Sequence, residues 1–154
     1  MKLLLAIFTL FTLSYAEQYT FLVASYDKEI ELEAKIVHQI ATASVGKPIK
    51  LFIPEITNVE KKIYSHFFTL VDDCNSSNFV FVNKNLNKKS PCEQAEKLFF
   101  TNNYQALLSN QKFYGAFFWS KSRPNIVFIK ERLAKKSVRL PKEYNRYIED
   151  FDGQ

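Results

Sequence analysis

The chain has 154 residues, of which 47% are hydrophobic, 24% charged and 16% aromatic. This composition excludes a disordered chain, a collagen-like repeat and a small disulfide-packed scaffold, and it suits one globular domain. Lys and Arg outnumber Asp and Glu by 21 to 16, but the resulting charge of +5 is spread along the chain, so we expect no nucleic-acid partner.

The N-terminal residues have the pattern of a cleavable signal peptide. Lys2 precedes an apolar run over residues 3–13, and Ser14 and Ala16 supply the small side chains before a cleavage site. The run is too short to span a membrane, which takes about 20 apolar residues. We therefore expect cleavage after Ala16 and export to the periplasm, with residues 17–154 forming one domain that does not cross the membrane.

The next segment predicts alternating strands and helices. Residues 18–24 are aromatic and β-branched, which is typical of a strand or of the start of the following helix. We expect Asp27 to be the N-cap of this helix and Gly46 to end it. Its buried face is expected to carry Leu32, Ile36, Ile40 and Ala43, with Val37 beside them. Residues 49–53 predict a short strand, which Pro54 ends.

A second helix is expected to start at Thr57 and Glu60, which have the spacing of a capping box. Its apolar stripe is expected to contain Val59, Ile63, Phe67 and Leu70. Residues 79–82 are apolar on both faces, as in a central strand of a covered sheet. An apolar run follows at residues 98–101, and residues 104–108 predict a short helix.

The C-terminal third predicts a hairpin. Residues 113–119 and 125–130 form two expected strands, and their short connection implies an antiparallel pair. Residues 131–136 predict a helical turn, and Pro141 suits the first position of a last helix. The order of these elements predicts a single α/β domain with a mixed sheet of about five strands covered by helices.

The two cysteines, Cys74 and Cys92, leave two alternatives open. An oxidising compartment favours a disulfide. The expected strand between them favours two separate thiols, unless the polar residues 83–91 fold back and bring the Cα atoms within about 7 Å. Neither cysteine has a neighbouring His, which argues against a thiol nucleophile.

No catalytic, metal-binding or cofactor motif occurs in the sequence. His38 and His66 lie on different expected helices without metal-ligand spacing, and there is no glycine-rich phosphate loop. We therefore expect a protein without catalytic residues, metal or cofactor. Asn75 begins an Asn-x-Ser acceptor preceded by Asp73, which makes it a candidate glycosylation site, with local turn formation as the alternative.

The aromatic strand at residues 113–119 allows two interpretations. One is a sheet core, since aromatic side chains favour strands. The other is a surface that binds a partner, since aromatic residues dominate interface energetics. The candidate residues of that surface are Tyr114, Phe118, Trp119, Lys121 and Arg123.

Several short segments follow one another in an order typical of one family of exported proteins. They are Glu33-Ala34-Lys35-Ile36-Val37, Lys50-Leu51-Phe52-Ile53, Asp73-Cys74, Val80-Phe81-Val82, Gly115-Ala116-Phe117-Phe118, Arg123–Ile129 and Leu133–Leu140. In this order they resemble the YfiR-like periplasmic proteins, over about residues 30–148. The resemblance implies a compact α/β domain without catalytic residues, and it leaves open whether the protein is a monomer or a homodimer.

The best-known member of that family sequesters the periplasmic domain of a membrane-bound diguanylate cyclase. The resemblance therefore implies that this protein binds a membrane-bound or periplasmic protein partner and inhibits its signalling. The alternative is a small-ligand binding module that feeds a transporter or sensor, which requires a cleft lined by convergent polar groups. An exposed aromatic patch around Trp119 would favour the protein partner.

Overall fold

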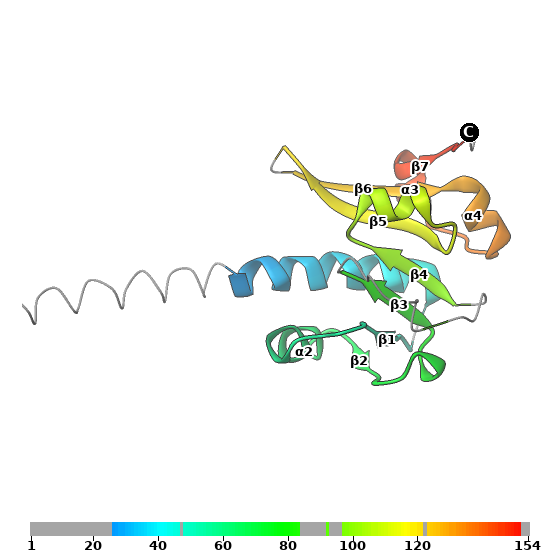
Figure 1. Cartoon of the computed structure of the whole chain (residues 1–154). Helices are drawn as coiled ribbons and strands as arrows, with labels where there is room; N and C mark the ends of the chain where they lie inside the picture. Colours follow the sequence, from blue (N-terminus) through cyan, green and yellow to red (C-terminus); the bar gives the residue numbers. More distant parts are fainter. Residues whose placement is uncertain (1–25, 47, 84–91, 93–96, 122, 152–154) are drawn as a thin grey trace, which may run out of the picture.

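A mixed sheet of seven strands organises the molecule, in the order β2-β1-β3-β4-β5-β6-β7 (Figure 1). The computed structural model describes residues 26–46, 48–83, 92, 97–121 and 123–151. The strands are β1 (Lys50–Phe52), β2 (Thr69–Leu70), β3 (Phe79–Val82), β4 (Leu98–Thr101), β5 (Phe113–Ser120), β6 (Arg123–Ile129) and β7 (Ile148–Glu149). Neighbouring strands are parallel throughout, apart from the antiparallel hairpin of β5 and β6.

Helices cover both faces of this sheet. They are the long helix (residues 26–45), α2 (Asn58–Tyr64), α3 (Tyr104–Ser109) and α4 (Lys130–Lys135), with short 3-10 turns η1 (Cys74–Ser76) and η2 (Lys142–Tyr147). The long helix, α2 and the C-terminal segment pack on one face, and α3 packs on the other. The predicted α/β class and hairpin are confirmed. The sheet has more strands than expected because β2 and β7 contain two residues each, too few for a periodic signal.

Aromatic rings fill the face under the long helix. The ring centroids of Phe81 and Phe100 lie 6.3 Å apart, those of Phe100 and Tyr114 5.8 Å, and those of Tyr114 and Phe128 5.9 Å. These rings belong to β3, β4, β5 and β6, so a continuous aromatic layer crosses the centre of the sheet. Sheet core is therefore the correct interpretation for much of the aromatic strand β5.

The face that the long helix turns to the sheet matches the expected one only in part, since Val37 and Ile40 are buried as expected. Its buried residues are Ile30, Ala34, Val37, Ile40 and Ala41. Leu32 is 43% exposed, and Asp27 already lies within the helix, so both expectations were wrong. Alanine has a weak hydrophobic signal, but at a helix–sheet contact its small size allows close packing. Gly46 ends the helix as predicted, with a positive φ of 77°.

The capping box at the start of α2 is confirmed, but the helix is shorter than its apolar stripe suggested. The Glu60 N–H donates to Thr57 Oγ1, and the Thr57 N–H donates to Glu60 Oε2. The helix ends at Tyr64, which is fully buried, whereas Val59 is 44% exposed and Leu70 belongs to strand β2.

The last expected helix is instead a 3-10 turn followed by a strand. Pro141 is the N-cap of η2, and β7 follows η2 directly. The expected strand at residues 18–24 lies outside the described residues, as do residues 84–91 of the expected loop.

The cysteine pair covers the sheet face opposite the long helix. The Cα atoms of Cys74 and Cys92 lie 5.9 Å apart, which is a disulfide distance. Both cysteines are buried against Val80 and Phe99. The Lys97 ammonium group donates to the Cys74 carbonyl and to the Ser77 carbonyl, which ties the start of β4 to η1.

Replacing Cys74 and Cys92 together by Ser should lower the free energy of unfolding by about 3 kcal/mol, because the cross-link restricts the unfolded chain. Urea denaturation of the oxidised wild type and the double variant measures this difference. The wild type in reducing buffer should match the variant. Equal stability of the oxidised and reduced wild type would mean that the two thiols are not bonded.

Gly115 lies where the sheet leaves no room for a side chain. The register of β4 and β5 shifts beside it, as in a β-bulge. A Cβ atom at this position would lie 2.6 Å from Phe128 Cδ1 and 2.8 Å from the Val127 carbonyl oxygen. Because the second contact is with backbone, the conflict cannot be relieved by a change of rotamer alone.

The variant Gly115→Ala should therefore lose about 1–3 kcal/mol of unfolding free energy, as overpacked cores do. Ser120→Ala, at the exposed end of the same strand, is the matched control and should change stability by less than about 0.5 kcal/mol. Urea denaturation compares the two variants. If Gly115→Ala had the same urea midpoint as wild type, β6 could move away from residue 115 without loss of stability.

Candidate functional site

The parallel strands β1, β3, β4 and β5 end on one side of the sheet, which we call the carboxyl edge. In open α/β sheets, ligands bind in the crevice outside such strand ends. Asn83 and Asn102 are the first residues after β3 and β4. The first turns of the long helix, the start of α2 and the tip of the β5–β6 hairpin lie on this same side (Figure 1, left).

A buried carboxylate joins α2 to the end of β3. Glu60 is only 6% exposed, and its carboxylate completes the capping box with Thr57. Its other oxygen accepts a hydrogen bond of 2.9 Å from Asn83 Nδ2. Glu60 therefore fixes both the start of α2 and the amide group of Asn83 at the carboxyl edge.

A second carboxylate joins the long helix to α2 and β4. Glu33 Oε1 accepts a hydrogen bond of 2.8 Å from the Tyr64 hydroxyl, and Glu33 Oε2 accepts one of 3.0 Å from Asn102 Nδ2. Burial raises the pKa of Glu33, and the nearby charge of Glu60 adds to the increase, although the two hydrogen bonds oppose it. Burial also raises the pKa of Tyr64, so its hydroxyl stays protonated and donates to Glu33.

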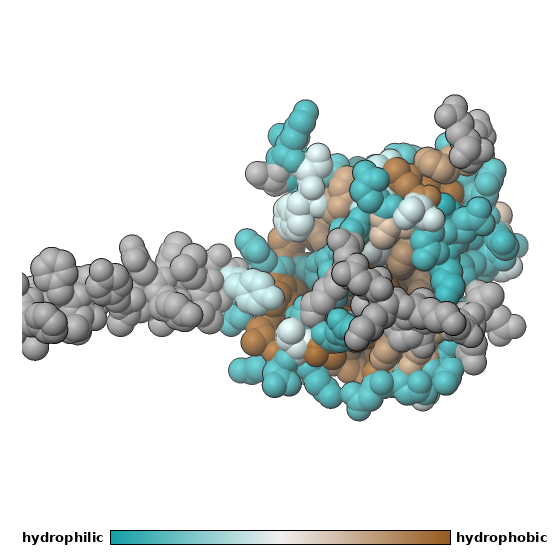
Figure 2. Space-filling view, viewed as in Figure 1, coloured by the Kyte–Doolittle hydropathy of each residue, from teal (hydrophilic) through white to brown (hydrophobic). Residues whose placement is uncertain are grey.

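Exposed hydrophobic side chains gather at the same edge. Among the described residues, the large hydrophobic side chains that are exposed are Tyr26, Leu32, Val59 and Trp119. They come from the first half of the long helix, the start of α2 and the end of β5. Figure 2 shows hydrophobic residues beside the first turns of the long helix. Leu32 and Trp119 line one groove, and an exposed apolar surface of this kind is typical of an interaction site.

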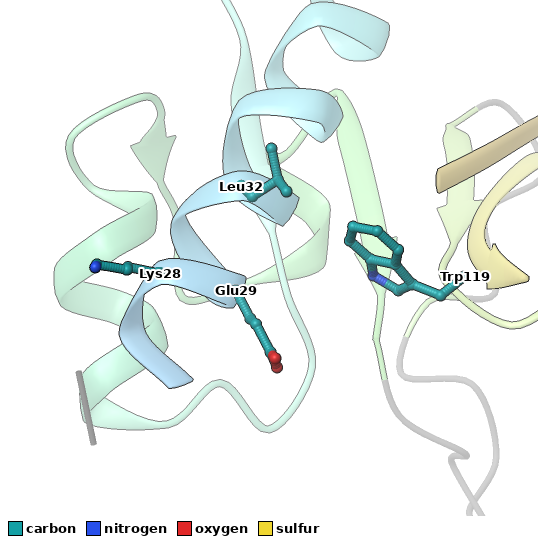
Figure 3. A pocket seen from close by; sticks show the side chains of 4 residues that line it. All are labelled: Lys28, Glu29, Leu32 and Trp119. Atoms are coloured by element: carbon teal, nitrogen blue, oxygen red, sulfur yellow. The ribbon is translucent and has the colours of Figure 1, made fainter. Parts of the chain in front are cut away.

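Trp119 lines both a groove and a cleft on the surface. On one side, a groove of about 590 Å³ separates its indole from Lys28, Glu29 and Leu32 of the long helix. Figure 3 shows the indole turned toward that helix, with Lys28 pointing away from it. On the other side, Trp119 borders a cleft of about 370 Å³ at the ends of β3 and β4 and the start of α3. The indole is 49% exposed and contacts Phe117 with ring centroids 5.7 Å apart.

Of the candidate partner residues predicted from the sequence, the structure exposes some and buries others. Tyr114 is fully buried, and its hydroxyl shares a hydrogen bond of 2.8 Å with Ser44 of the long helix, so it cannot contact a partner. Phe118 is half-buried against Tyr104, with ring centroids 4.8 Å apart. Lys121 and Arg123 are exposed at the tip of the hairpin. Side chains alternate across a strand, which is why Tyr114 faces the core.

The remaining predicted residues lie away from the carboxyl edge or take part in packing. Asn75 is exposed in η1, where its modification stays a prediction. The His38 ring packs edge-on against Phe68, with centroids 5.2 Å apart, whereas His66 is exposed in the turn after α2. Within the described ranges, no group of three or more His, Cys, Asp or Glu side chains is arranged to hold a metal ion.

Sequence reasoning missed the polar network of Glu33, Glu60, Tyr64, Asn83 and Asn102. One signal was present, because an Asn directly follows each of two buried strands, and parallel strands place such residues at one edge. Nothing in the sequence marked Glu33 or Glu60 as part of a site, since both occur in ordinary amphipathic helix patterns. Only the packing of the two helices on the same sheet face brings them together.

No protein-family model, no curated protein and no solved structure matches this chain. In the described part of the chain, no helix has both the length and the apolar character needed to cross a membrane.

The raised pKa of Glu33 predicts a pH dependence of stability. The folded state holds the Glu33 proton to a higher pH than the unfolded state, so this residue makes the wild type less stable as pH rises above about 4.5. Glu33→Gln removes that dependence and keeps one acceptor oxygen, which can accept a hydrogen bond from Tyr64 or from Asn102 but not replace both bonds. The stability of the variant relative to wild type should therefore increase with pH, as measured by urea denaturation between pH 4 and 7.

Glu31→Gln is the matched control on the same helix. The hydrogen bond and charge of Lys35 lower the pKa of the exposed Glu31. The stability of Glu31→Gln relative to wild type should therefore decrease slightly as pH rises, opposite to that of Glu33→Gln. Identical pH curves for Glu33→Gln and wild type would contradict the buried, proton-binding carboxylate.

Proposed function

We propose that the protein is exported to the periplasm and binds a protein partner there through its carboxyl edge. We further propose that it acts as a YfiR-like inhibitor of a membrane-bound signalling protein such as a diguanylate cyclase. The observation that carries the proposal is that Trp119 and Leu32, exposed apolar side chains from two different elements, line one groove at this edge.

The geometry around Trp119 supports protein recognition. Its contact with Phe117 restrains the indole, so less side-chain entropy is lost when a partner covers it. The groove of about 590 Å³ between Trp119 and Leu32 is large enough to accept a side chain inserted by a partner. Tryptophan residues beside such hollows are frequent hot spots of protein interfaces.

The charged residues at the hairpin tip favour a partner with acidic groups. Lys121 and Arg123 are exposed there, next to Trp119, whereas Lys28 and Glu29, which have opposite charges, both border the groove. A charged rim around an apolar centre is the usual arrangement of a protein interface, and it mainly increases the rate and specificity of association.

The test is crosslinking in the cells that encode the protein, with the full chain carrying a C-terminal tag. We expect recovery of an inner-membrane protein that has a periplasmic sensor or cyclase domain. Trp119→Ala and Leu32→Ala should each lower its recovery at least about tenfold, the effect expected for a hot-spot residue. The purified periplasmic domain of the recovered protein should show the same ranking in a direct binding assay.

Arg139→Ala is the control, because Arg139 is exposed beyond α4 and far along the chain from the carboxyl-edge residues. It should leave recovery unchanged, and all three variants should retain the urea midpoint of wild type. Equal recovery by wild type and Trp119→Ala, or recovery of a second copy of the chain alone, would overturn the proposal.

A further inference from the structure

The cleft of about 370 Å³ beside Trp119 differs in chemistry from the apolar groove on the other side of the indole. It lies at the carboxyl ends of β3 and β4, where α3 begins, and Trp119 and Phe118 of β5 form one wall. Its volume is within the range of small-molecule sites. Its position is the usual one for a ligand in a parallel sheet.

The polar groups of this cleft are side-chain amides. Asn83, Asn102, Asn103 and Gln105 line it, and none of its described lining residues carries a charge. Asn102 and Asn83 are held by hydrogen bonds from their nitrogen atoms to the carboxylates of Glu33 and Glu60. Each amide offers both donors and an acceptor, which matches a ligand whose groups also do both.

One of these amides has an oxygen without a hydrogen-bond donor among the described residues. Asn83 Oδ1 is buried, and among the described residues none donates a hydrogen bond to it. A buried acceptor in this state lowers stability unless a donor reaches it. The Asn83 nitrogen is already engaged with Glu60, so the amide is held in place for a ligand donor.

Three aromatic side chains, Tyr104, Phe118 and Trp119, supply the apolar part of the cleft. The rings of Tyr104 and Phe118 contact each other, with centroids 4.8 Å apart, whereas Trp119 remains 49% exposed. A pyranose ring has one face of C–H groups that packs on an indole, and hydroxyl groups around its rim that both donate and accept. Among the described residues that line the cleft there is no cation to replace the hydration of an anionic ligand, which favours a neutral one.

We propose that this cleft binds a neutral saccharide, with one pyranose ring packed on Trp119 and its hydroxyl groups hydrogen-bonded to Asn83 and Gln105. This inference is independent of the protein partner proposed above, because it concerns the purified protein alone. A negative result for the protein partner would not contradict saccharide binding, and a negative result for saccharide binding would not contradict the protein partner.

The test uses the intrinsic fluorescence of the purified protein without residues 1–16. Trp119 is the chain's single tryptophan, so the emission reports on this site directly. Titration with cellobiose and with N,N′-diacetylchitobiose should give a saturable change in the emission of Trp119 for at least one of them. Glucuronic acid and glucosamine, which carry a negative and a positive charge, should bind at least about tenfold more weakly.

Two glutamine variants provide matched measurements. Gln105→Ala should weaken saccharide binding about threefold to tenfold, the effect of one lost hydrogen bond. Gln111→Ala, which removes an exposed glutamine beyond the far end of α3, should leave binding unchanged. Both variants keep Trp119, so the same fluorescence measurement applies to them.

The proposal is overturned if neither saccharide changes the emission up to tens of millimolar, or if Gln105→Ala and Gln111→Ala bind equally well. It is also overturned if glucosamine binds more tightly than the neutral sugars, since that result would indicate a site for cations on the aromatic wall. Calorimetry with Trp119→Ala should show no binding of the saccharide that wild type binds.

Discussion

The carboxylate of Glu33 holds together the part of the molecule on which both proposals depend. It accepts hydrogen bonds from Tyr64 of α2 and from Asn102 at the end of β4, so one side chain connects the long helix, the second helix and the sheet. A carboxylate taken out of water is tolerated only when hydrogen bonds replace its hydration. This requirement places the first half of the long helix across the carboxyl edge, where Leu32 is left exposed.

Glu60 repeats this arrangement one turn before Tyr64, and it fixes Asn83. The two carboxylates therefore orient the two asparagines that follow the central strands, and these asparagines form the polar part of the cleft. The apolar part comes from β5, whose alternation sends Tyr114 into the core, whereas Trp119, near the end of the strand, remains exposed. The oriented asparagines and the exposed indole of Trp119 therefore come from different elements of the fold.

The sequence predicts those features of the fold that depend on local patterns. The capping box at Thr57 and Glu60, the end of the long helix at Gly46, the buried strand at residues 79–82 and the hairpin all follow from short-range chemistry. It failed in part for the face of the long helix, because Ala34 and Ala41 carry little hydrophobic signal although both are fully buried. It also failed for β2 and β7, which exist only because neighbouring strands pair with them.

The sequence by itself determined the α/β class and the order of most elements. Tertiary structure alone decided that Tyr114 is buried, that Cys74 and Cys92 meet, and that Glu33 lies between Tyr64 and Asn102. The physical reason is distance along the chain. Turns, caps and periodicities join residues a few positions apart, whereas the carboxyl edge joins residues from the long helix, α2 and three strands, and only the pairing of the sheet brings them together.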